Sequence, residues 1–471
     1  MLSGLRKYAS LVTVEPSLFL YMFGTFMFYP LLQNMVYSHY SNGAHSDNAS
    51  NASNASTCGL VSSVSAHTSH FIFYLTLSSI LPGALSTLLL GRWSDSSGRK
   101  LLMALPAAGA AFNAIVSLLV YKLTWNINIL LLGGLGAGLL GSYAMFNQAS
   151  FAYVADISSA QHRTRRLGIL EAMIYLGMTT GSEVGGVWTE QHGYGPPFWG
   201  VIVTLILVLA YVVFVVREAP LPQSPSHKVS TRMYMVSILH GFRLFTKPSP
   251  QRKSRLVILL AFVFATINFN ALIDVTIPYL RDDPFHWQFD VIGHYLALGN
   301  FMHGISALAI LPGLLHLGLS DITCIQVGII SSMLSLILLG LAQRTWLVFL
   351  VPIVGTLRGM VVPCVRANLS KFVKADEHGA LFSSIAIVEI CCTAIASLIY
   401  NNAYPATCSI LPSSHGFVFI LMSVCLLPPL CMFWWVGRQT PANDAVSVPV
   451  DVQDDGLSET DELLQDSCDD P

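Results

Sequence analysis

Long apolar runs separated by shorter polar segments dominate the chain. Each run is about 20 residues long, the length at which an α-helix crosses the roughly 30 Å hydrocarbon core of a bilayer. The pattern therefore predicts twelve transmembrane helices, near residues 16–37, 69–91, 101–122, 127–153, 167–188, 198–216, 256–280, 291–315, 321–342, 345–365, 381–402 and 415–436.

The apolar runs form two groups of six on either side of a polar, proline-rich segment. The chain is accordingly expected to divide into an N-terminal half, a cytosolic linker, a C-terminal half and a disordered acidic tail, at residues 1–216, 217–255, 256–436 and 437–471. Two six-helix halves around a site in the middle of the membrane are typical of secondary transporters.

Composition supports a membrane protein and excludes several other classes. The 471 residues are 53% hydrophobic and 11% charged, against roughly 25% charged residues in soluble domains. A net charge of −2 gives no basic face for nucleic acid, so the lipid bilayer is the expected partner. We find no catalytic motif and no paired CxxC among the nine cysteines, so neither an enzyme nor a metal site is predicted.

Arginine and lysine gather in alternate loops, after the second, fourth, sixth and tenth runs. Because cytosolic loops carry the excess of positive charge, both termini should be cytosolic. The loop at 38–68 then faces outward or into a lumen. It holds three consecutive acceptor sequons, at Asn48, Asn51 and Asn54, and glycosylation requires that side of the membrane.

The segment between the second and third runs carries a recognisable motif. It reads Gly91-Arg-Trp-Ser-Asp95-Ser-Ser-Gly98-Arg99-Lys100 and matches the GxxxDxxGR[RK] signature of the major facilitator superfamily. Gly91 allows helices to approach, Gly98 permits a tight turn, and Asp95 can pair with a cation or a helix N-terminus. We interpret the segment, with Arg99, as a conformational gate between the two halves.

Ionisable residues within the apolar runs are the next signal, because each costs roughly 2.5–3.5 kcal/mol at a helix centre. A water-filled pathway is the simplest way to accommodate several of them. The candidates are Glu171, Glu183, Asp274, His294, His303, Arg358, Arg366 and Glu389.

Three acids are candidates for proton coupling: Glu171, Glu389 and Asp274. Glu171 lies one turn into its run, where burial disfavours the charged carboxylate, as a proton-coupling group requires. A structural bond to a neighbouring helix is the alternative for Glu171.

Two arginines and three other polar residues are candidates for substrate binding. Arg366 can hold an anionic substrate or a carboxylate, or can extend to the membrane interface. Arg358 lies about two turns deeper, and His303 is a further candidate. Asn268 and Asn270 are two residues apart, so one should line a cavity while the other bonds between helices.

Several short stretches together resemble solute carrier family 46, which contains the proton-coupled folate transporter and a lysosomal steroid-conjugate transporter. The resemblance covers most of the chain and rests on Val14-Glu15-Pro16, Gly91 to Lys100, Val154-Ala-Asp156, Leu170-Glu171-Ala172, Gly193-Tyr to Phe198-Trp199, Arg366 to Lys371, Gly379 to Phe382 and Tyr404 to Thr407. It implies an all-α major facilitator fold and transport coupled to protons, with no other cofactor.

The resemblance also implies roles for single residues. It assigns proton coupling to Glu171, substrate and proton handling to Arg366, and the conformational cycle to Asp95 and Asp156. The folate transporter has a histidine in the seventh span where this chain has Asn268 or Phe269, which argues against folate itself.

Other features are nearer the lysosomal branch, among them Glu389 and the tail. The tail segment Glu459-Thr-Asp-Glu-Leu463-Leu464 is similar to an acidic dileucine sorting signal, which clathrin adaptors bind. A lysosomal or endosomal membrane is therefore favoured over the plasma membrane. The family pairs a first-loop cysteine with one after span seven, but here Cys58 faces His286-Trp287, so Cys58 is either free or paired with Cys408.

These observations predict a proton-coupled symporter of a small organic anion, such as a steroid conjugate, a bile acid, a folate or a muropeptide-like solute. The alternative is a receptor or sensor that keeps the transporter fold without net transport. Retention of both Glu171 and Arg366 favours transport.

Overall fold

The computed structural model describes residues 13–50, 57–97, 99–141, 143–157, 160–218, 252–282, 284–370, 378–410 and 416–439. Within these ranges the chain is helical and contains no strand, which confirms the predicted all-α class.

The first group of helices forms one bundle with its own hydrophobic core, made of side chains between Val14 and Val216. A helix that is apolar on most sides is stable only when other helices or lipid cover it. The bundle consists of α2 (Glu15–Ser50), α3 (Thr57–Ser97), α4 (Lys100–Leu123), η1 (Ile127–Ile129), α5 (Leu130–Leu140), α6 (Tyr143–Ile157), α7 (Ala160–His192) and α8 (Gly195–Phe214).

The second group forms a second bundle, whose core side chains lie between Ile258 and Val436. It consists of α10 (Arg252–Arg281), α11 (Phe289–Ile305), the π-helical segment η2 (Ser306–Ile310), α12 (Leu311–His316), α13 (Asp321–Leu341), α14 (Thr345–Val354), the 3₁₀ segment η3 (Thr356–Met360), α15 (Val361–Ser370), α16 (His378–Ile410), α17 (Phe417–Val424) and α18 (Leu427–Gln439).

Nine helical stretches in the described part of the chain are long and apolar enough to cross a membrane. The three other predicted spans coincide with α2, α3 and α7, which are helical but are not among the nine. All three contact the second bundle, α2 through α10, α3 through α16 and α7 through α11. Polar residues are tolerated there because they can face one another or water.

Several boundaries differ from the prediction. The expected loop at 38–68 is largely helical, because α2 continues to Ser50 and α3 begins at Thr57. Hydropathy locates only the apolar part of a helix. A helix satisfies its own backbone hydrogen bonds in water as well as in lipid, so it can continue beyond its apolar run. The run at 127–153 is interrupted at Gly141, whose φ of 110° is unfavourable for other residues.

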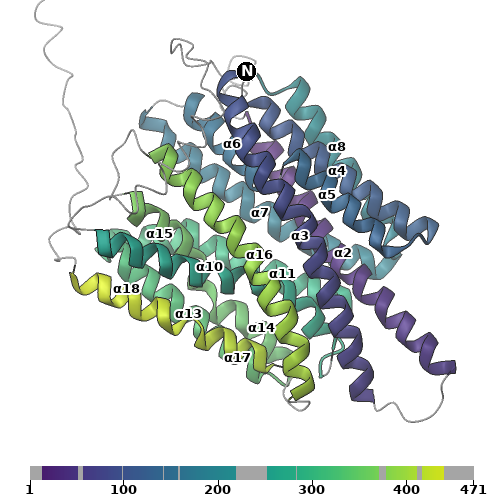
Figure 1. Cartoon of the computed structure of the whole chain (residues 1–471). Helices are drawn as coiled ribbons and strands as arrows, with labels where there is room; N and C mark the ends of the chain where they lie inside the picture. Colours follow the sequence, from purple (N-terminus) through teal and green to yellow (C-terminus); the bar gives the residue numbers. More distant parts are fainter. Residues whose placement is uncertain are drawn as a thin grey trace, which may run out of the picture.

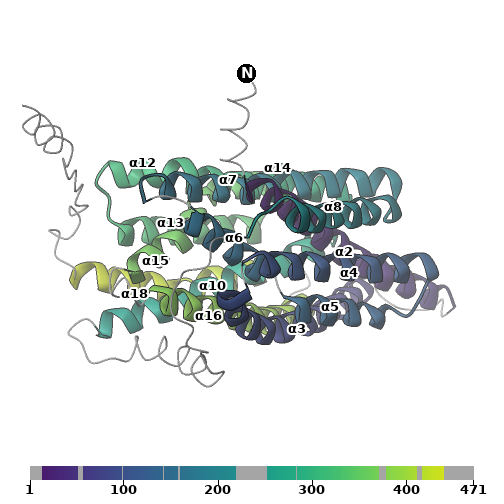
Figure 2. The ribbon, with the colours of Figure 1, turned by 90° about the horizontal axis from the view of Figure 1, so that it is seen from above.

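The two bundles lie side by side, and two seams join them (Figure 1 and Figure 2). In one seam α3 lies beside α16 and α2 beside α10, and in the other α7 lies along α11. We call the two ends of the molecule the Glu15 end, where α2, α7 and α10 begin, and the Asp282 end, which follows the last residue of α10.

Candidate functional site

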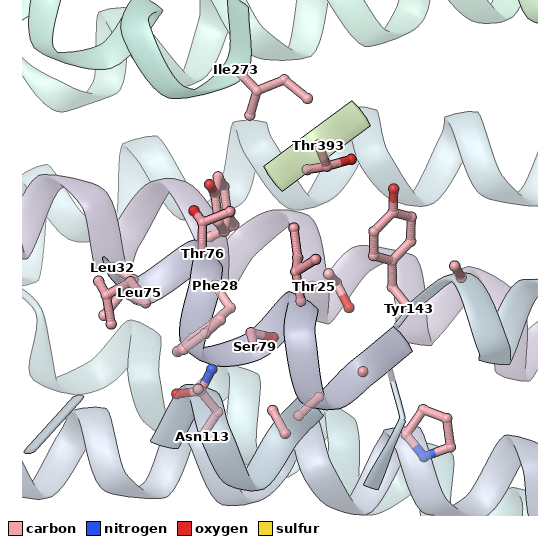
Figure 3. A pocket seen from close by; sticks show the side chains of 18 of the residues that line it. Thr25, Phe28, Leu32, Leu75, Thr76, Ser79, Asn113, Tyr143, Ile273 and Thr393 are labelled. Atoms are coloured by element: carbon pink, nitrogen blue, oxygen red, sulfur yellow. The ribbon is translucent and has the colours of Figure 1, made fainter. Parts of the chain in front are cut away.

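A cavity of about 310 Å³ lies between helices of both bundles (Figure 3). Its wall is mostly apolar, with polar side chains at intervals, including Thr25, Thr76, Ser79, Asn113, Tyr143, Asn270, Asp274, Glu389 and Thr393. Predominantly apolar walls with a few placed polar groups are typical of sites for small organic ligands.

Asp274 lines this cavity and also joins the two bundles. Its Oδ1 accepts a hydrogen bond of 2.7 Å from the hydroxyl of Tyr29 in α2, and its Oδ2 accepts one of 3.1 Å from Nδ2 of Asn401 in α16. Asn401 in turn donates to the hydroxyl of Ser397 at 2.8 Å. The carboxyl group is therefore shared by three helices.

The same arrangement is repeated two helical turns further along. Asp282 accepts hydrogen bonds of 2.8 Å from Tyr37 of α2 and of 2.8 Å from Tyr404 of α16. The guanidinium carbon of Arg281 lies 5.5 Å from the ring centroid of Tyr37. We call Tyr29–Asp274–Asn401 and Tyr37–Asp282–Tyr404 the two rungs. Together they close the Asp282 end between α2, α10 and α16.

The second seam is built on close backbone contact. A Cβ atom at Gly186 of α7 would lie 2.6 Å from Cα of Gly293 in α11, so only glycine fits there. Polar contacts flank this point. Glu190 accepts a hydrogen bond of 2.9 Å from the backbone N–H of Phe289, and Glu183 lies 2.6 Å from Nδ1 of His294.

The contact between α7 and α11 continues to Gly304, against which the ring of Tyr175 packs. One turn closer to the Glu15 end, Glu171 is partly buried and makes no hydrogen bond or ion pair with the residues that the structure describes. Arg366 of α15 is the charged group that acts on it electrostatically. The carboxyl group of Glu171 therefore has no hydrogen-bond or ion-pair partner among the described residues at the point where the seam ends.

Arg366 itself is paired. Its Nη2 donates to both carboxylate oxygens of Glu389 in α16, at 2.6 and 2.8 Å. Of the two partners that the sequence allowed for Arg366, the structure shows the carboxylate. Tyr143, which lines the cavity, lies within electrostatic range of this pair.

The two asparagines of α10 separate as their spacing predicts. Asn270 lines the cavity. Asn268 is buried, donates to the carbonyl oxygen of Phe264 at 2.8 Å and accepts from the hydroxyl of Tyr400 at 2.8 Å. Its amide therefore serves helix packing rather than the cavity.

Arg358 and His303 are also brought together, in a pair of interrupted helices. Arg358 lies in η3, and its Nη2 donates to the carbonyl oxygen of Phe269 at 3.3 Å. The backbone of His303 lies against Gly359, and Arg358 acts electrostatically on its imidazole.

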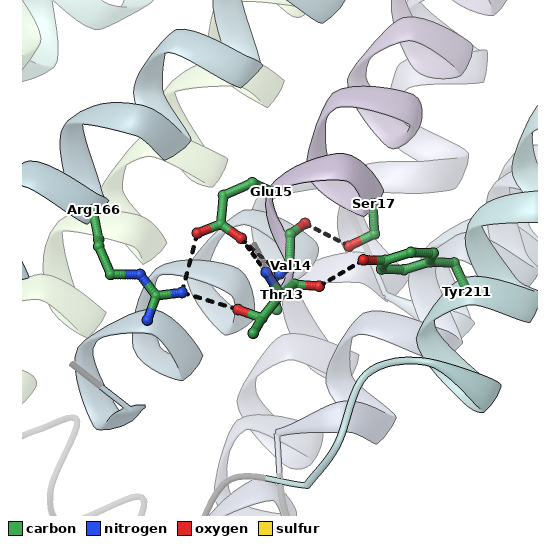
Figure 4. Close-up of polar contacts among 6 residues, drawn as sticks. All are labelled: Thr13, Val14, Glu15, Ser17, Arg166 and Tyr211. Carbon is green, nitrogen blue, oxygen red and sulfur yellow. Dashed lines mark hydrogen bonds and ion pairs between the residues drawn. The ribbon is translucent and has the colours of Figure 1, made fainter. Parts of the chain in front are cut away.

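A third charged pair lies at the Glu15 end and within one bundle (Figure 4). Arg166 at the start of α7 donates to Oε1 of Glu15 at 3.1 Å and to the hydroxyl of Thr13 at 3.0 Å. The second oxygen of Glu15 accepts from the backbone N–H groups of Thr13 and Val14. This buried pair fixes α2 to α7 but does not join the two bundles.

The predicted gate motif is only partly described. Gly91 and Asp95 lie in α3, Asp156 lies in α6, and the side chains of the two aspartates are outside the described part. α3 ends at Ser97, and Arg99 immediately precedes Lys100, the first residue of α4.

Other predicted sites also fall outside what the structure describes. Asn48 lies in α2, but nothing is described of its side chain or of those of Cys58 and Cys408. Asn51, Asn54, Gly98, Glu459, Leu463 and Leu464 lie outside the described residues altogether.

Sequence analysis missed the rungs and the glycine contact. A signal for the rungs was present, because the two tyrosines of α2 have the same eight-residue spacing as Asp274 of α10 and Asp282, which directly follows α10. Eight residues on a helix bring side chains back to nearly the same face. Nothing in one sequence says which helices face each other.

Two helical bundles, joined along two seams around a partly polar cavity, define a membrane transporter of the major facilitator type. A family model described as Major Facilitator Superfamily matches residues 15–399. The chain belongs to this superfamily and, within it, to solute carrier family 46, as its motifs predict.

Two relatives support the family assignment. The proton-coupled folate transporter of Rattus norvegicus is 33% identical over 378 residues, which cover 79% of this chain and 80% of the relative. The lysosomal proton-coupled steroid conjugate and bile acid symporter SLC46A3 of Gallus gallus is 26% identical over 458 residues, 93% of this chain and 97% of the relative.

Solved structures show the same fold. The human organic anion transporter MFSD10 (TETRAN) superposes with a TM-score of 0.63 at 17% identity, over 91% of this chain and 99% of that one. The xylose transporter XylE from E. coli, in a partially occluded inward open conformation, gives 0.55 at 14% identity, over 91% and 98%. At these identities the likeness concerns the fold alone.

Proposed function

We propose that the protein is a proton-coupled symporter of a small organic anion, such as a steroid conjugate, a bile acid, a folate or a muropeptide-like solute. The observation that carries the proposal is the uncommitted carboxyl group of Glu171, beside the seam between the bundles and within electrostatic range of Arg366. The names of the relatives, a proton-coupled folate transporter and a proton-coupled steroid conjugate and bile acid symporter, support the same activity.

Proton coupling in this proposal depends on competition for Arg366. When Glu171 is protonated, Arg366 stays with Glu389, as observed at 2.6 and 2.8 Å. When Glu171 loses its proton, its carboxylate attracts the same guanidinium, because opposite charges interact strongly in a poorly solvated setting. The proton is the coupling ion, and no other cofactor is required.

Alternating access follows from the two bundles rocking against each other. In this proposal the bundles are the halves 1–216 and 256–436, although α10 already begins at Arg252 and α18 ends only at Gln439. The positive charge of alternate loops supports a cytosolic Glu15 end, which places Asn48, Asn51 and Asn54 on the opposite side for glycosylation. In this proposal the rungs at the Asp282 end close the side that faces away from the cytosol.

The proposed location is a lysosomal or endosomal membrane, with the plasma membrane as the alternative. The lysosomal name of one relative and the tail segment with Glu459, Leu463 and Leu464 support it. In this reading a clathrin adaptor binds the tail. Changing Leu463 and Leu464 to alanine would move protein to the cell surface, where uptake can be measured.

The test is uptake of a sulfated steroid, a bile acid, a folate and a muramyl dipeptide at acidic and neutral pH, by surface-displayed protein with and without Glu171→Gln. We expect acid-stimulated uptake of at least one compound, and we expect its acid-to-neutral ratio to fall to about 1 in the variant, because glutamine cannot take up the coupling proton.

The matched control is Glu190→Gln on the same helix. Its amide oxygen can still accept the hydrogen bond from Phe289, so acid stimulation should persist. Unchanged stimulation in Glu171→Gln would remove Glu171 from coupling. Binding of a compound without uptake at either pH would favour the receptor or sensor.

A further inference from the structure

Arg358 differs in its surroundings from Arg366, the other arginine predicted to bind substrate. It lies in η3, the 3₁₀ turn that separates α14 from α15. Its guanidinium carbon is 4.7 Å from the ring centroid of Phe269, and its Nη2 donates to the carbonyl oxygen of the same residue at 3.3 Å. One aromatic residue therefore fixes both the plane and one edge of the guanidinium group.

A second helix irregularity faces this turn. The π-helical segment η2 follows α11 and contacts η3. A Cβ atom at Gly359 would lie 2.6 Å from the carbonyl oxygen of His303, so the two backbones touch. Irregular backbone at membrane depth is tolerated where it is buried in protein or lines a cavity. Facing interruptions of this kind mark binding sites for charged groups in transporters.

Arg366 has a nearby carboxylate that compensates its charge, whereas Arg358 has none among the described residues. Arg366 has the carboxylate of Glu389 as its partner. Arg358 forms no ion pair with any residue that the structure describes, and the groups near it on α10 and α11 are a phenyl ring, a phenol and an imidazole, from Phe269, Tyr295 and His303. A guanidinium group within the membrane is costly unless an anion compensates it.

We propose that Arg358 binds the anionic head group of the transported solute, a sulfate or a carboxylate carried on an apolar body. The guanidinium fork suits two oxygens of one oxyanion, and the stacked ring of Phe269 holds the fork in place. The partly exposed ring of Phe269 offers an apolar surface to the rest of the ligand. The inference rests on the proposed function and narrows it, since it assigns the substrate charge to Arg358 and leaves Arg366 with Glu389.

The experiment measures binding of a radiolabelled sulfated steroid and of the same steroid without sulfate to the purified full-length protein. We expect wild type to prefer the sulfate, and we expect Arg358→Gln to weaken binding of the sulfate by about 10- to 100-fold, as for loss of a charged hydrogen-bonded partner. Binding of the unsulfated steroid should stay within about twofold. Arg358→Lys should fall between the two, because lysine keeps the charge without the fork.

The control is Arg438→Gln. Arg438 of α18 also stacks on an aromatic side chain, with its guanidinium carbon 3.5 Å from the ring centroid of Trp434, but it lies at the end of the last helix. Its loss should leave the preference for sulfate unchanged. Thermal unfolding of each variant shows that it is folded, and Arg358→Lys decides the question if Arg358→Gln does not fold.

Two results would overturn the proposal: equal affinity of wild type for both steroids, including no binding of either, or an undiminished sulfate preference in a folded Arg358 variant. The outcome is separable from that of the proposed function. Binding that depends on Arg358 without acid-stimulated uptake would support the binding site and contradict proton-coupled symport. Acid-stimulated uptake that does not depend on Arg358 would support symport and contradict the binding site.

Discussion

The two seams between the bundles are closed by different physical means. Along α2, α10 and α16, tyrosine and asparagine side chains donate hydrogen bonds to two aspartates. Along α7 and α11, the backbones themselves meet at Gly186 and Gly293, and the polar contacts lie to either side. The first seam depends on donors and acceptors, and the second depends on shape.

The difference suggests that the two seams have different roles when the bundles rock against each other. A hydrogen bond can be exchanged for one to water or to a ligand at small net cost, so the rungs are suited to opening. A glycine contact between helix backbones cannot be replaced by water and tolerates little displacement. We therefore expect the α7–α11 seam to act as a pivot and the rungs to act as the gate at the Asp282 end.

The largest effect should come from breaking the pivot. Gly293→Ala places a Cβ atom 2.7 Å from Cα of Gly186 and 3.0 Å from the carbonyl oxygen of Ser182, so the two helices must separate. We expect a loss of about 3 kcal/mol of stability, the upper part of the range for overpacked interiors, and a lower midpoint of thermal unfolding.

The matched control for the pivot lies on the same helix. Gly299 has open space around its Cβ position, so Gly299→Ala should be neutral or slightly stabilising. Equal midpoints for the two variants would show that the close contact between α7 and α11 contributes nothing particular.

An intermediate effect is expected at the rungs. Tyr29→Phe and Tyr37→Phe each remove one O–H donor from a carboxyl group and keep the ring. Each should cost about 1 to 2 kcal/mol, within the range for a buried acceptor that loses a partner. Hydrogen exchange at the backbone amides of residues 279–282 should become faster, because the Asp282 end opens more often.

Tyr121→Phe is the control for the rungs, since the exposed Tyr121 donates no hydrogen bond within the described part of the chain. Exchange at residues 279–282 that is the same in all three variants would mean that the rungs do not hold the Asp282 end closed.

The sequence predicted the helices of both seams but not the seams. The predicted runs coincide with helices of both bundles, and nine of them in the described part have the length and composition that a bilayer imposes. Helix ends were less predictable. Polar residues continue a helix as well as apolar ones do, so α2 extends to Ser50, and the interruptions in α11 and around Thr356–Met360 carry no hydropathy signal.

The candidate site was predictable as a set of residues but not as a set of pairs. The cost of burying charge singled out Glu171, Arg366 and Glu389 from the sequence. Which of the two acids pairs with Arg366 depends on how α7, α15 and α16 are placed relative to one another. A single sequence does not contain that information. The tyrosines of the rungs carry no charge, so the cost of burying charge in the membrane gave no reason to select them.

The smallest effect is expected at the side-chain contact that flanks the pivot, between Glu183 and His294. The atoms are 2.6 Å apart, but the side chains are 42% and 46% exposed, so solvent screens their attraction. Glu183→Gln should therefore cost less than about 1 kcal/mol, and added salt should shrink the difference from wild type further. Thermal unfolding at low and high salt checks both points. If Glu183→Gln instead lowered stability as much as Gly293→Ala, charge rather than backbone shape would hold α7 to α11, and the contrast between the two seams would disappear.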